Sequence, residues 1–255
     1  MCRDQMVGAE GVFNREQKQM TERLCFAAQP PVSVAIQNSD VRFPVHRIFC
    51  VGRNYHAHAA EMGVTVDKAT TQPFYFNKHP SAIIESGSDI AYPPETSNYH
   101  FEMELVVALG AGGFQVSETA AIDLVYGYAA GLDMTRRDLQ QRAKDNAHPW
   151  DLGKDFEQAA VISPLVIKRE DALLQQGSIE LSVNQSMKQS SNLSLMIWSV
   201  AELVCDLSRY YRLLPGDLIY TGTPEGVGPV LPGDCLQGRI EGVGQVVANI
   251  TAPAV

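Results

Sequence analysis

The sequence predicts a β-rich α+β fold, in which a body built mainly of strands carries a few helices. The chain has 255 residues, enough for a single sizeable hydrophobic core. Its 20 glycines and 14 prolines supply many turns, and short Val, Ile and Leu runs lie between them. Such runs are typical of short successive strands rather than of long helices.

Composition and charge exclude several classes of protein. Hydrophobic residues make up 45% of the chain and charged residues 19%, as in a globular protein rather than a disordered one. The formal net charge is −9 and no basic stretch could follow a phosphate backbone, so we expect no nucleic-acid partner. No apolar run approaches the roughly 20 residues that cross a bilayer, and the N-terminus lacks an apolar signal core. We therefore expect a cytoplasmic protein with no membrane partner.

The chain divides into an extension and one domain. Residues 1–40 combine a polar N-terminal extension with a proline-containing linker, and no later linker divides residues 41–255. Within this domain, residues 46–52 contain the apolar run IFCV and predict a short buried strand that ends at Gly52. Residues 53–63 are alanine-rich and end at a glycine, which indicates a short helix. Residues 73–84 predict an aromatic strand interrupted at a proline.

The remaining elements follow from hydrophobic periodicity and turn signals. Residues 100–110 alternate before they become wholly apolar, which predicts a strand entering the core, and residues 122–133 predict a second apolar strand. A polar helix is expected to begin near Thr135, because Thr135 and Asp138 have the spacing of a capping box. Residues 193–211 predict a further helix, and the two Pro-Gly-Asp turns within residues 213–250 predict successive short strands.

Two glutamates at the start of a predicted strand are candidate metal ligands. Glu102 and Glu104 are two residues apart, so both side chains leave the same face, with Cα atoms about 6.5 Å apart. His100 shares this face. An E-x-E pair more often lies on the solvated face of an edge strand. Here the strand continues into an apolar run, however, and two buried carboxylates would be costly without a cation.

Asp133 is the third candidate ligand, because it ends the second apolar strand just before a predicted helix. Taken alone, it is equally well explained as a helix-terminal or turn aspartate. A set of carboxylates with no Cys or His at zinc spacing favours Mg²⁺ or Mn²⁺ over Zn²⁺, and Ca²⁺ also fits.

Five motifs occur in order along residues 45–250: CVGRNY-x-x-H-x-x-E-M, H-x-E-x-E, Y-x-x-GLDMT-x-RD-x-Q, PWDLGK-x-F and TGTP-x-GVGP. Together they resemble the fumarylacetoacetate hydrolase family. The resemblance implies that residues 41–255 form a single catalytic domain with the family's mixed, mainly antiparallel β-roll. It also implies a homodimer.

The resemblance further implies a role for each matching position. It makes Glu102, Glu104 and Asp133 the metal ligands. It assigns catalytic roles to His58, Glu61 and Lys154, with His58 and Glu61 on a short helix that covers bound ligand. The positions that match substrate contacts are Arg137, Gln140 and Thr223, together with Arg53, Lys78 and Ser81 in matching segments.

Without the family pattern, most of these positions have ordinary explanations. Spacing alone favours a surface pair for His58 and Glu61, with His56 as a rival in the same turn. Lys154 has the alternative of a surface lysine, Arg137 and Gln140 that of a solvated helix face, and the turn around Thr223 that of a simple connection.

The activity implied by the resemblance is metal-dependent cleavage of a carbon–carbon bond in an acylpyruvate. The expected reaction is hydrolysis of fumarylpyruvate, a small anionic keto acid of aromatic catabolism, to fumarate and pyruvate. Two other enzyme activities use similar enolate chemistry: oxaloacetate decarboxylation and isomerisation of a 2-hydroxy-dienedioate. A metal- or keto-acid-binding protein without catalytic activity is the alternative from a different class.

Overall fold

A computed structural model of the chain describes residues 24–169 and 173–254. The helices and strands of the described residues all lie within one compact unit, Pro31–Val255. The assignment of residues 1–40 to an extension and of residues 41–255 to one catalytic domain stays a prediction. Regular structure begins earlier than residue 41, in a two-stranded hairpin of β1 (Ser33–Ala35) and β2 (Arg42–Pro44).

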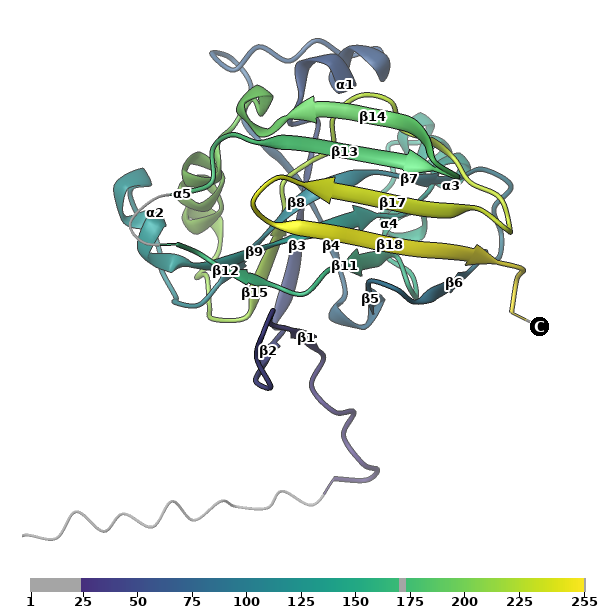
Figure 1. Ribbon diagram of the computed structural model, residues 1–255. Helices are drawn as coiled ribbons and strands as arrows, with labels where there is room; N and C mark the ends of the chain where they lie inside the picture. Colours follow the sequence, from purple (N-terminus) through teal and green to yellow (C-terminus); the bar gives the residue numbers. More distant parts are fainter. Residues whose placement is uncertain (1–23, 170–172, 255) are drawn as a thin grey trace, which may run out of the picture. The chain divides into compact units, whose positions relative to one another are not determined.

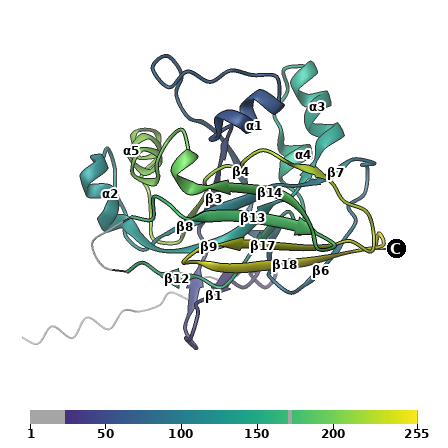
Figure 2. The same ribbon diagram turned by 45° about the horizontal axis from the view of Figure 1, so that its top comes forward.

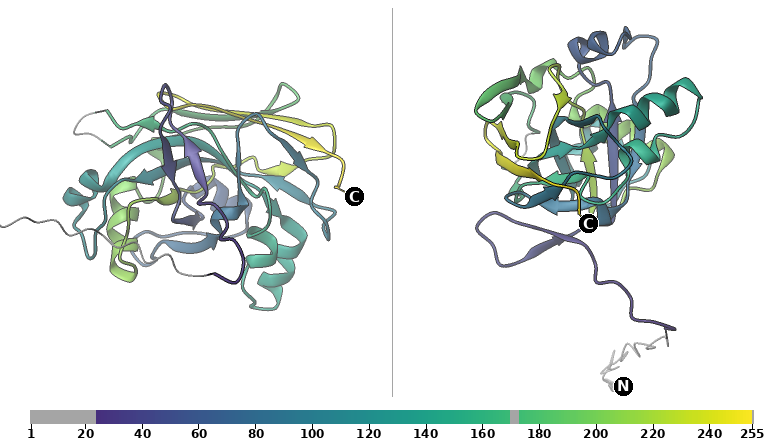
Figure 3. Two further views of the ribbon diagram at one scale, coloured as in Figure 1. Left: turned by 90° about the horizontal axis from the view of Figure 1, so that it is seen from below. Right: turned by 90° about the vertical axis from the view of Figure 1, so that its right-hand side faces the viewer.

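The largest sheet has eight strands and curls into a half-barrel (Figure 3, left). Its strands run in the order β4-β3-β15-β8-β9-β11-β5, and β12 pairs with β9 beside this path. The strands of this sheet are β3 (Arg47–Gly52), β4 (Phe74–Lys78), β5 (Ile83–Glu85), β8 (Met103–Leu109), β9 (Val125–Asp133), β11 (Ala160–Ile162), β12 (Val166–Ile167) and β15 (Asp217–Tyr220).

Two smaller sheets accompany it. The five-stranded sheet has the order β14-β13-β17-β18-β6, and the three-stranded sheet has the order β10-β7-β16. Their strands are β6 (Asp89–Ala91), β7 (Tyr99–Phe101), β10 (Thr135–Arg136), β13 (Ser178–Val183), β14 (Ser186–Asn192), β16 (Gly228–Pro229), β17 (Cys235–Ile240) and β18 (Gly244–Thr251). The pairings β3/β15, β5/β11 and β6/β18 are parallel, and the other strand pairings within the described sheets are antiparallel. The predicted β-rich, mixed and mainly antiparallel fold is confirmed.

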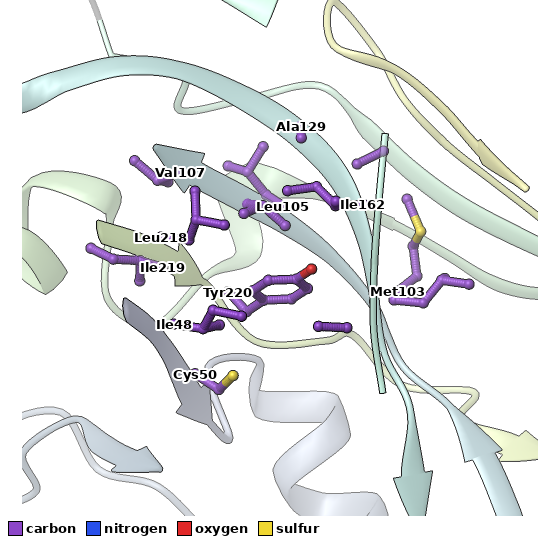
Figure 4. Close-up of a cluster of buried hydrophobic side chains, with 14 of the residues drawn as sticks. Ile48, Cys50, Met103, Leu105, Val107, Ala129, Ile162, Leu218, Ile219 and Tyr220 are labelled. Atoms are coloured by element: carbon purple, nitrogen blue, oxygen red, sulfur yellow. The ribbon is translucent and has the colours of Figure 1, made fainter. Parts of the chain in front are cut away.

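The five-stranded sheet packs across the middle of the large sheet (Figure 1). In this packing β13 contacts β8, while β17 and β18 contact β9. All residues of β8 are buried, as expected of a strand that is covered on both faces. Figure 4 shows apolar side chains of β3, β8 and β15, among them Ile48, Leu105 and Tyr220, gathered in one core cluster. This core fixes the start of β8, where Glu102 and Glu104 lie.

The helices are short, and all but α1 lie at the two ends of the sheets (Figure 2). One end carries the packed pair α2 and α5, and the other carries the packed pair α3 and α4. In α5, residues at spacings of three and four are buried, and Ser199 and Glu202 form a complete capping box. The bounds are α1 (His56–Glu61), α2 (Glu118–Leu124), α3 (Arg137–Asp145), α4 (Asp151–Lys154) and α5 (Val200–Tyr210), with 3₁₀ turns at Pro80–Ala82 and Leu193–Leu195. No helix among the described residues is long and apolar enough to cross a membrane.

The predicted capping box at Thr135 is wrong. The helix begins at Arg137, and its N-cap residue, Arg136, makes no side-chain capping bond. Thr135 lies on β10, and its hydroxyl donates to the carbonyl of Asp133 at 3.2 Å. The Asp138 carboxylate instead accepts the hydroxyl of Thr96 at 2.6 Å. Thr135 therefore belongs to the buried strand β10 and not to the start of the helix, where its spacing to Asp138 had placed it.

The helix predicted over residues 193–211 is shorter than expected. Its first residues form the 3₁₀ turn Leu193–Leu195, and α5 begins only at Val200. The Asn192 side chain caps the 3₁₀ turn by accepting the backbone N–H of Ser194 at 2.9 Å. The apolar residues before α5 thus belong to a turn, although the hydrophobic pattern of this segment does not distinguish the turn from the helix.

Candidate active site

Three buried carboxylates converge where β8 and β9 pair. The antiparallel register places Met103 opposite Leu132, so Glu102 and Asp133, one step beyond this pair, face each other. The backbone N–H of Asp133 donates to the carbonyl of Glu102 at 2.9 Å. Glu104 follows Glu102 by two residues and points to the same face. One carboxylate oxygen of each of the three acidic residues lies within 4.8 Å of the other two.

Three cationic side chains contact this cluster. Lys154 Nζ donates to Glu102 Oε2 at 2.8 Å and to Asp133 Oδ2 at 2.7 Å. Arg137 Nη2 donates to Glu102 Oε1. Lys78 Nζ lies 2.9 Å from Asp133 Oδ1 but without hydrogen-bond geometry, so this buried oxygen has no hydrogen-bond donor among the described residues. The cations therefore satisfy Glu102 fully and Asp133 only in part.

Glu104 lacks a cation altogether. It is 1% exposed, and no lysine, arginine or histidine of the described residues forms an ion pair with it. Burial and the charges of Asp133 and Glu102 raise the pKa of Glu104 well above its ordinary value. Burial is the largest influence on Glu102 and acts to raise its pKa, but the positive charges of Lys154 and Arg137, with a smaller one from His58, together outweigh burial and hold that pKa below its usual range. The cluster of oxygen donors with one uncompensated carboxylate fits a hard divalent cation such as Mg²⁺ or Mn²⁺.

The short helix α4 brings Lys154 to the carboxylates. Its last residue is Lys154, which is 2% exposed and also donates to Thr135 Oγ1 at 2.7 Å. Burial lowers the pKa of Lys154, but Asp133 and Glu102 outweigh it and leave the pKa above its ordinary value. Gly153 permits this approach, because a Cβ at this position would lie 2.8 Å from the backbone N of Gln140 on α3.

His58 and Glu61 form a hydrogen-bonded pair on α1. His58 Nδ1 lies 3.2 Å from Glu61 Oε2, and the Glu61 carboxylate also accepts the backbone N–H of Gly226 at 3.3 Å. His58 is buried, whereas its rival His56 is exposed. Burial lowers the pKa of His58, although the charges of Glu102 and Glu61 oppose this shift. The imidazole is therefore mostly neutral at pH 7, as a general base requires.

One cavity is lined by Glu102 of the carboxylate cluster, by His58 of α1 and by residues of α3, α4 and the Thr223 loop, whereas Glu104, Asp133 and Glu61 lie outside its lining. Within it, Arg137 Nη1 donates to Gln140 Oε1 at 2.6 Å, which fixes the guanidinium between Gln140 and Glu102. The lining residues are Val51, Gly52, Arg53, His58, Met62, Phe76, Glu102, Arg137, Gln140, Lys144, Trp150, Lys154 and Thr223.

Of the three residues assigned to substrate contacts only by their matching segments, one lines the cavity and two do not. Arg53 lines the cavity and has a left-handed backbone conformation, with φ of 61°, which is uncommon for a residue with a side chain. Lys78 is fully buried behind the carboxylates and does not line the cavity. Ser81 is exposed on the 3₁₀ turn, where its hydroxyl lies 2.8 Å from His79 Nδ1, and it also does not line the cavity. The structure therefore does not bring Lys78 and Ser81 to the cavity wall.

Gln189 is a site residue that the sequence reasoning missed. It is fully buried on β14, and its Oε1 accepts the backbone N–H of Met103, between the two glutamates, at 3.0 Å. Its Nε2 donates to Thr223 Oγ1 and to the carbonyl of Pro224, each at 2.8 Å. Gln189 thus connects the carboxylate strand to the Thr223 loop. No local pattern marks it, because it lies in a polar segment and acts through residues far away in the chain.

Comparisons with known proteins agree with this geometry. Residues 47–251 match the fumarylacetoacetate (FAA) hydrolase C-terminal family. A fumarylpyruvate hydrolase of a Ralstonia species is 57% identical over 189 residues, covering 74% of this chain and 98% of the relative. The mitochondrial oxaloacetate tautomerase of Bos taurus is 39% identical over 206 residues, covering 81% of this chain and 92% of the relative.

A solved structure extends the likeness to three dimensions. The fumarylpyruvate hydrolase from Pseudomonas aeruginosa, in complex with Mn²⁺ and pyruvate, has a TM-score of 0.86 and 45% identity. The match covers 90% of this chain and 100% of that one. The family match spans most of the chain, and the carboxylate cluster lies within it. The chain therefore belongs to the fumarylacetoacetate hydrolase family.

Proposed function

We propose that this protein is a metal-dependent hydrolase that cleaves the carbon–carbon bond of an acylpyruvate, converting fumarylpyruvate to fumarate and pyruvate. The observation that carries the proposal is that one cavity is lined both by Glu102, a member of the carboxylate cluster, and by His58, which is hydrogen-bonded to Glu61. The likeness to two fumarylpyruvate hydrolases supports the choice of acyl group.

The metal would be held by Glu102, Glu104 and Asp133. When bound, Mg²⁺ or Mn²⁺ supplies a Lewis acid for the oxygens of a keto acid, and Ca²⁺ also suits such oxygen donors. The Mn²⁺ in the related Pseudomonas structure supports a divalent metal as the cofactor. Since the three carboxylates already face three cationic side chains, a divalent ion gives the cluster a net positive charge, which favours an anionic substrate.

Lys154 and Arg137 would stabilise negative charge that develops on the pyruvate part. Both are held in place before substrate arrives, Lys154 by three oxygen atoms and Arg137 by Glu102 and Gln140. Fixed positive groups in a water-poor site stabilise a transition state without reorganising, which is the largest contribution in many enzymes.

His58 would be the general base and Glu61 the residue that orients it. With Nδ1–H donating to Glu61, the free Nε2 accepts a proton from water. The hydroxide oxygen bonds to the acyl carbonyl carbon, and the bond from that carbon to the pyruvate methylene breaks. The electron pair leaves as the enolate of pyruvate, which takes up a proton, while the acyl part departs as a carboxylate.

Thr223 would bind the carboxylate of the pyruvate end. Its Oγ1 accepts a hydrogen bond from Gln189, which leaves the hydroxyl proton free to donate to an anion. Gly222 and Gly226 in the same loop have positive φ angles of 95° and 90°, so the backbone can turn tightly beside the ligand.

A second candidate function is tautomerisation of oxaloacetate, which the likeness to mitochondrial oxaloacetate tautomerases favours. The decarboxylation and isomerisation alternatives would use the same cluster without an attacking water. A homodimeric state, a cytoplasmic location and a part in aromatic catabolism complete the proposal; they are supported by the family resemblance. Light scattering on the purified protein measures the oligomeric state.

An ultraviolet assay with the Mn²⁺- or Mg²⁺-loaded protein tests the function. Fumarylpyruvate should be consumed, with fumarate and pyruvate formed in equal amounts. Mass spectrometry separates the alternatives: hydrolysis adds one water, decarboxylation of oxaloacetate releases CO₂, and isomerisation leaves the mass unchanged. Binding of oxalate without turnover of any acylpyruvate or oxaloacetate would establish a binding protein instead and overturn the proposal.

A further inference from the structure

Lys144 lines the active-site cavity but has no role in the proposed hydrolysis. It lies on α3 seven residues after Arg137, so it shares a helical face with Arg137 and Gln140. All three line the same cavity. Its neighbour Arg142 is exposed and does not line this cavity.

The cavity contains both compensated and uncompensated cations. Lys154 and Arg137 are ion-paired with the carboxylates. Lys144 and Arg53 form no side-chain hydrogen bond and no ion pair with any of the described residues (24–169 and 173–254). Two cations without counter-ions at one cavity wall leave room for a negative charge that the protein itself does not supply.

Packing holds Lys144 at this wall. Its Nζ lies 5.0 Å from the centre of the Trp150 ring, a cation–π contact. Trp150 is itself fixed by ring contacts with Phe74 and Phe76, at centroid distances of 4.9 Å and 5.9 Å. Phe76 and Trp150 line the cavity, so a flat apolar wall lies beside the ammonium. A conjugated chain that ends in a carboxylate would match this combination of surfaces.

The electrostatic surroundings of Lys144 support the same conclusion. Burial, followed by the positive charges of Arg137 and Arg53, lowers the pKa of Lys144 to about 8. Each of these effects disfavours the charged lysine. An anion bound between Lys144 and Arg53 would relieve the repulsion and stabilise the ammonium.

We propose that Lys144 determines substrate specificity, by binding the carboxylate at the acyl end of the substrate, with Arg53 beside it. This inference rests on the proposed acylpyruvate hydrolysis. The keto-acid end occupies the carboxylate cluster and Thr223, and the far end of the acyl chain reaches the aromatic wall and Lys144. The site thereby favours dianionic acylpyruvates over monoanionic ones.

The test compares two substrates that differ at the acyl end. Fumarylpyruvate carries a second carboxylate, and acetylpyruvate does not. In Lys144→Met, kcat/KM for fumarylpyruvate should fall about 10- to 100-fold, as for loss of a hydrogen-bonded charge pair, mainly through a higher KM. Acetylpyruvate should be unaffected. Lys144→Arg should restore most of the activity on fumarylpyruvate. Arg142→Met, which removes the same charge from the same helix, should leave kcat/KM unchanged for both substrates.

If Lys144→Met lowered kcat/KM equally for the two substrates, or did not lower it for fumarylpyruvate, the proposed role of Lys144 would be overturned. If the unmodified enzyme consumes neither substrate, the proposed function fails, and binding then decides the role of Lys144 separately. Calorimetric titration of the Mn²⁺-loaded protein with fumarate and with crotonate, which has one carboxylate, provides this readout. Lys144→Met should raise the Kd of fumarate at least tenfold and leave the Kd of crotonate unchanged. An equal Kd for fumarate in the variant and the unmodified protein would contradict the inference.

Discussion

At the residue scale, His58 depends most on its surroundings for its chemistry. Burial lowers its pKa and keeps the imidazole neutral, while the Glu61 carboxylate orients the ring and raises the pKa again. The pair is bonded to Gly226, so the base on α1 is tied to the loop that contains Thr223. Binding of substrate in that loop would therefore also position the base.

Glu61→Gln tests this arrangement. A base works in its neutral form, so activity falls as the pH drops below the pKa of His58. Because Glu61 raises that pKa, its replacement should move the acidic limb of the kcat/KM profile to lower pH. The plateau should fall by roughly 10- to 100-fold through poorer orientation. Steady-state kinetics across the acid range measures both effects.

The exposed Glu118 on α2 provides the matched control, and Glu118→Gln should leave the profile unchanged. An acidic limb that stayed in place, or moved to higher pH, would show that Glu61 does not act through His58.

The sequence predicted the individual site residues unevenly. Glu102, Glu104 and Asp133 could be proposed from spacing and from the apolar strands around them, since alternation fixes the face of a strand. His58 required the family motif, because its spacing to Glu61 is equally typical of a surface pair. Other features of the site depend on long-range strand pairing, which one sequence does not reveal. These are the burial of Lys78, the hydrogen bond between Lys154 and Thr135, and the contacts of Gln189.

At the element scale, the contact between α3 and α4 sets the position of Lys154. The two helices touch at Gly153, where no side chain separates them. The close contact brings the end of α4 to the cluster and leaves Arg137, on α3, against Glu102. The position of the active-site lysine thus depends on a missing methyl group.

Gly153→Ala should therefore impair the site. The added Cβ would approach three Gln140 atoms at 2.8–2.9 Å, so α4 must shift away from α3. We expect a loss of about 1–3 kcal/mol in the free energy of unfolding, as for overpacking, and weaker Mn²⁺ binding with lower kcat. Leu152→Ala, at an exposed position of the same helix, should have little effect. Denaturant unfolding of both variants measures the difference, and equal stability would contradict the packing argument.

Elements with strong periodicity or strong turn signals were predicted best. The apolar strands β3, β8, β9 and β15 and the glycine-ended helix α1 agree with the sequence patterns. The hairpin of β13 and β14 was not predicted, because β14 carries mostly exposed polar residues and is ordered by pairing with its neighbour. Helix α2 is short, and only its Ser117 cap marks its start.

At the scale of the whole molecule, the two sheet layers bury a charged cluster in the interior. Such a cluster destabilises the fold unless each charge is compensated. The three cations compensate Glu102 and part of Asp133 but leave Glu104 uncompensated. A bound divalent cation should therefore stabilise the whole fold as well as complete the site.

Thermal unfolding checks this coupling. At an ion concentration of 100 times Kd, binding adds about 2.7 kcal/mol to the free energy of unfolding, which corresponds to a rise in Tm of at least roughly 5 °C. Addition of a chelator should reverse the rise. In Glu104→Gln the shift should be small or absent, while Glu118→Gln should behave like the unmodified protein. A Tm independent of Mn²⁺ and Mg²⁺ would contradict the link between the cluster and stability.

The overall architecture was more predictable than its details. Composition, glycine and proline content and the motif order predicted a β-rich fold with few helices. Strand order, the packing of the five-stranded sheet on the large one and the start of regular structure at Ser33 depend on contacts between distant segments. These contacts leave no local pattern in the sequence.

The most direct test of the central claim is anomalous diffraction from crystals grown with Mn²⁺ and oxalate, a mimic of the pyruvate enolate. We predict one strong manganese peak bonded to carboxylate oxygens of Glu102, Glu104 and Asp133. No peak among these three side chains, or a peak held by other residues, would contradict the account.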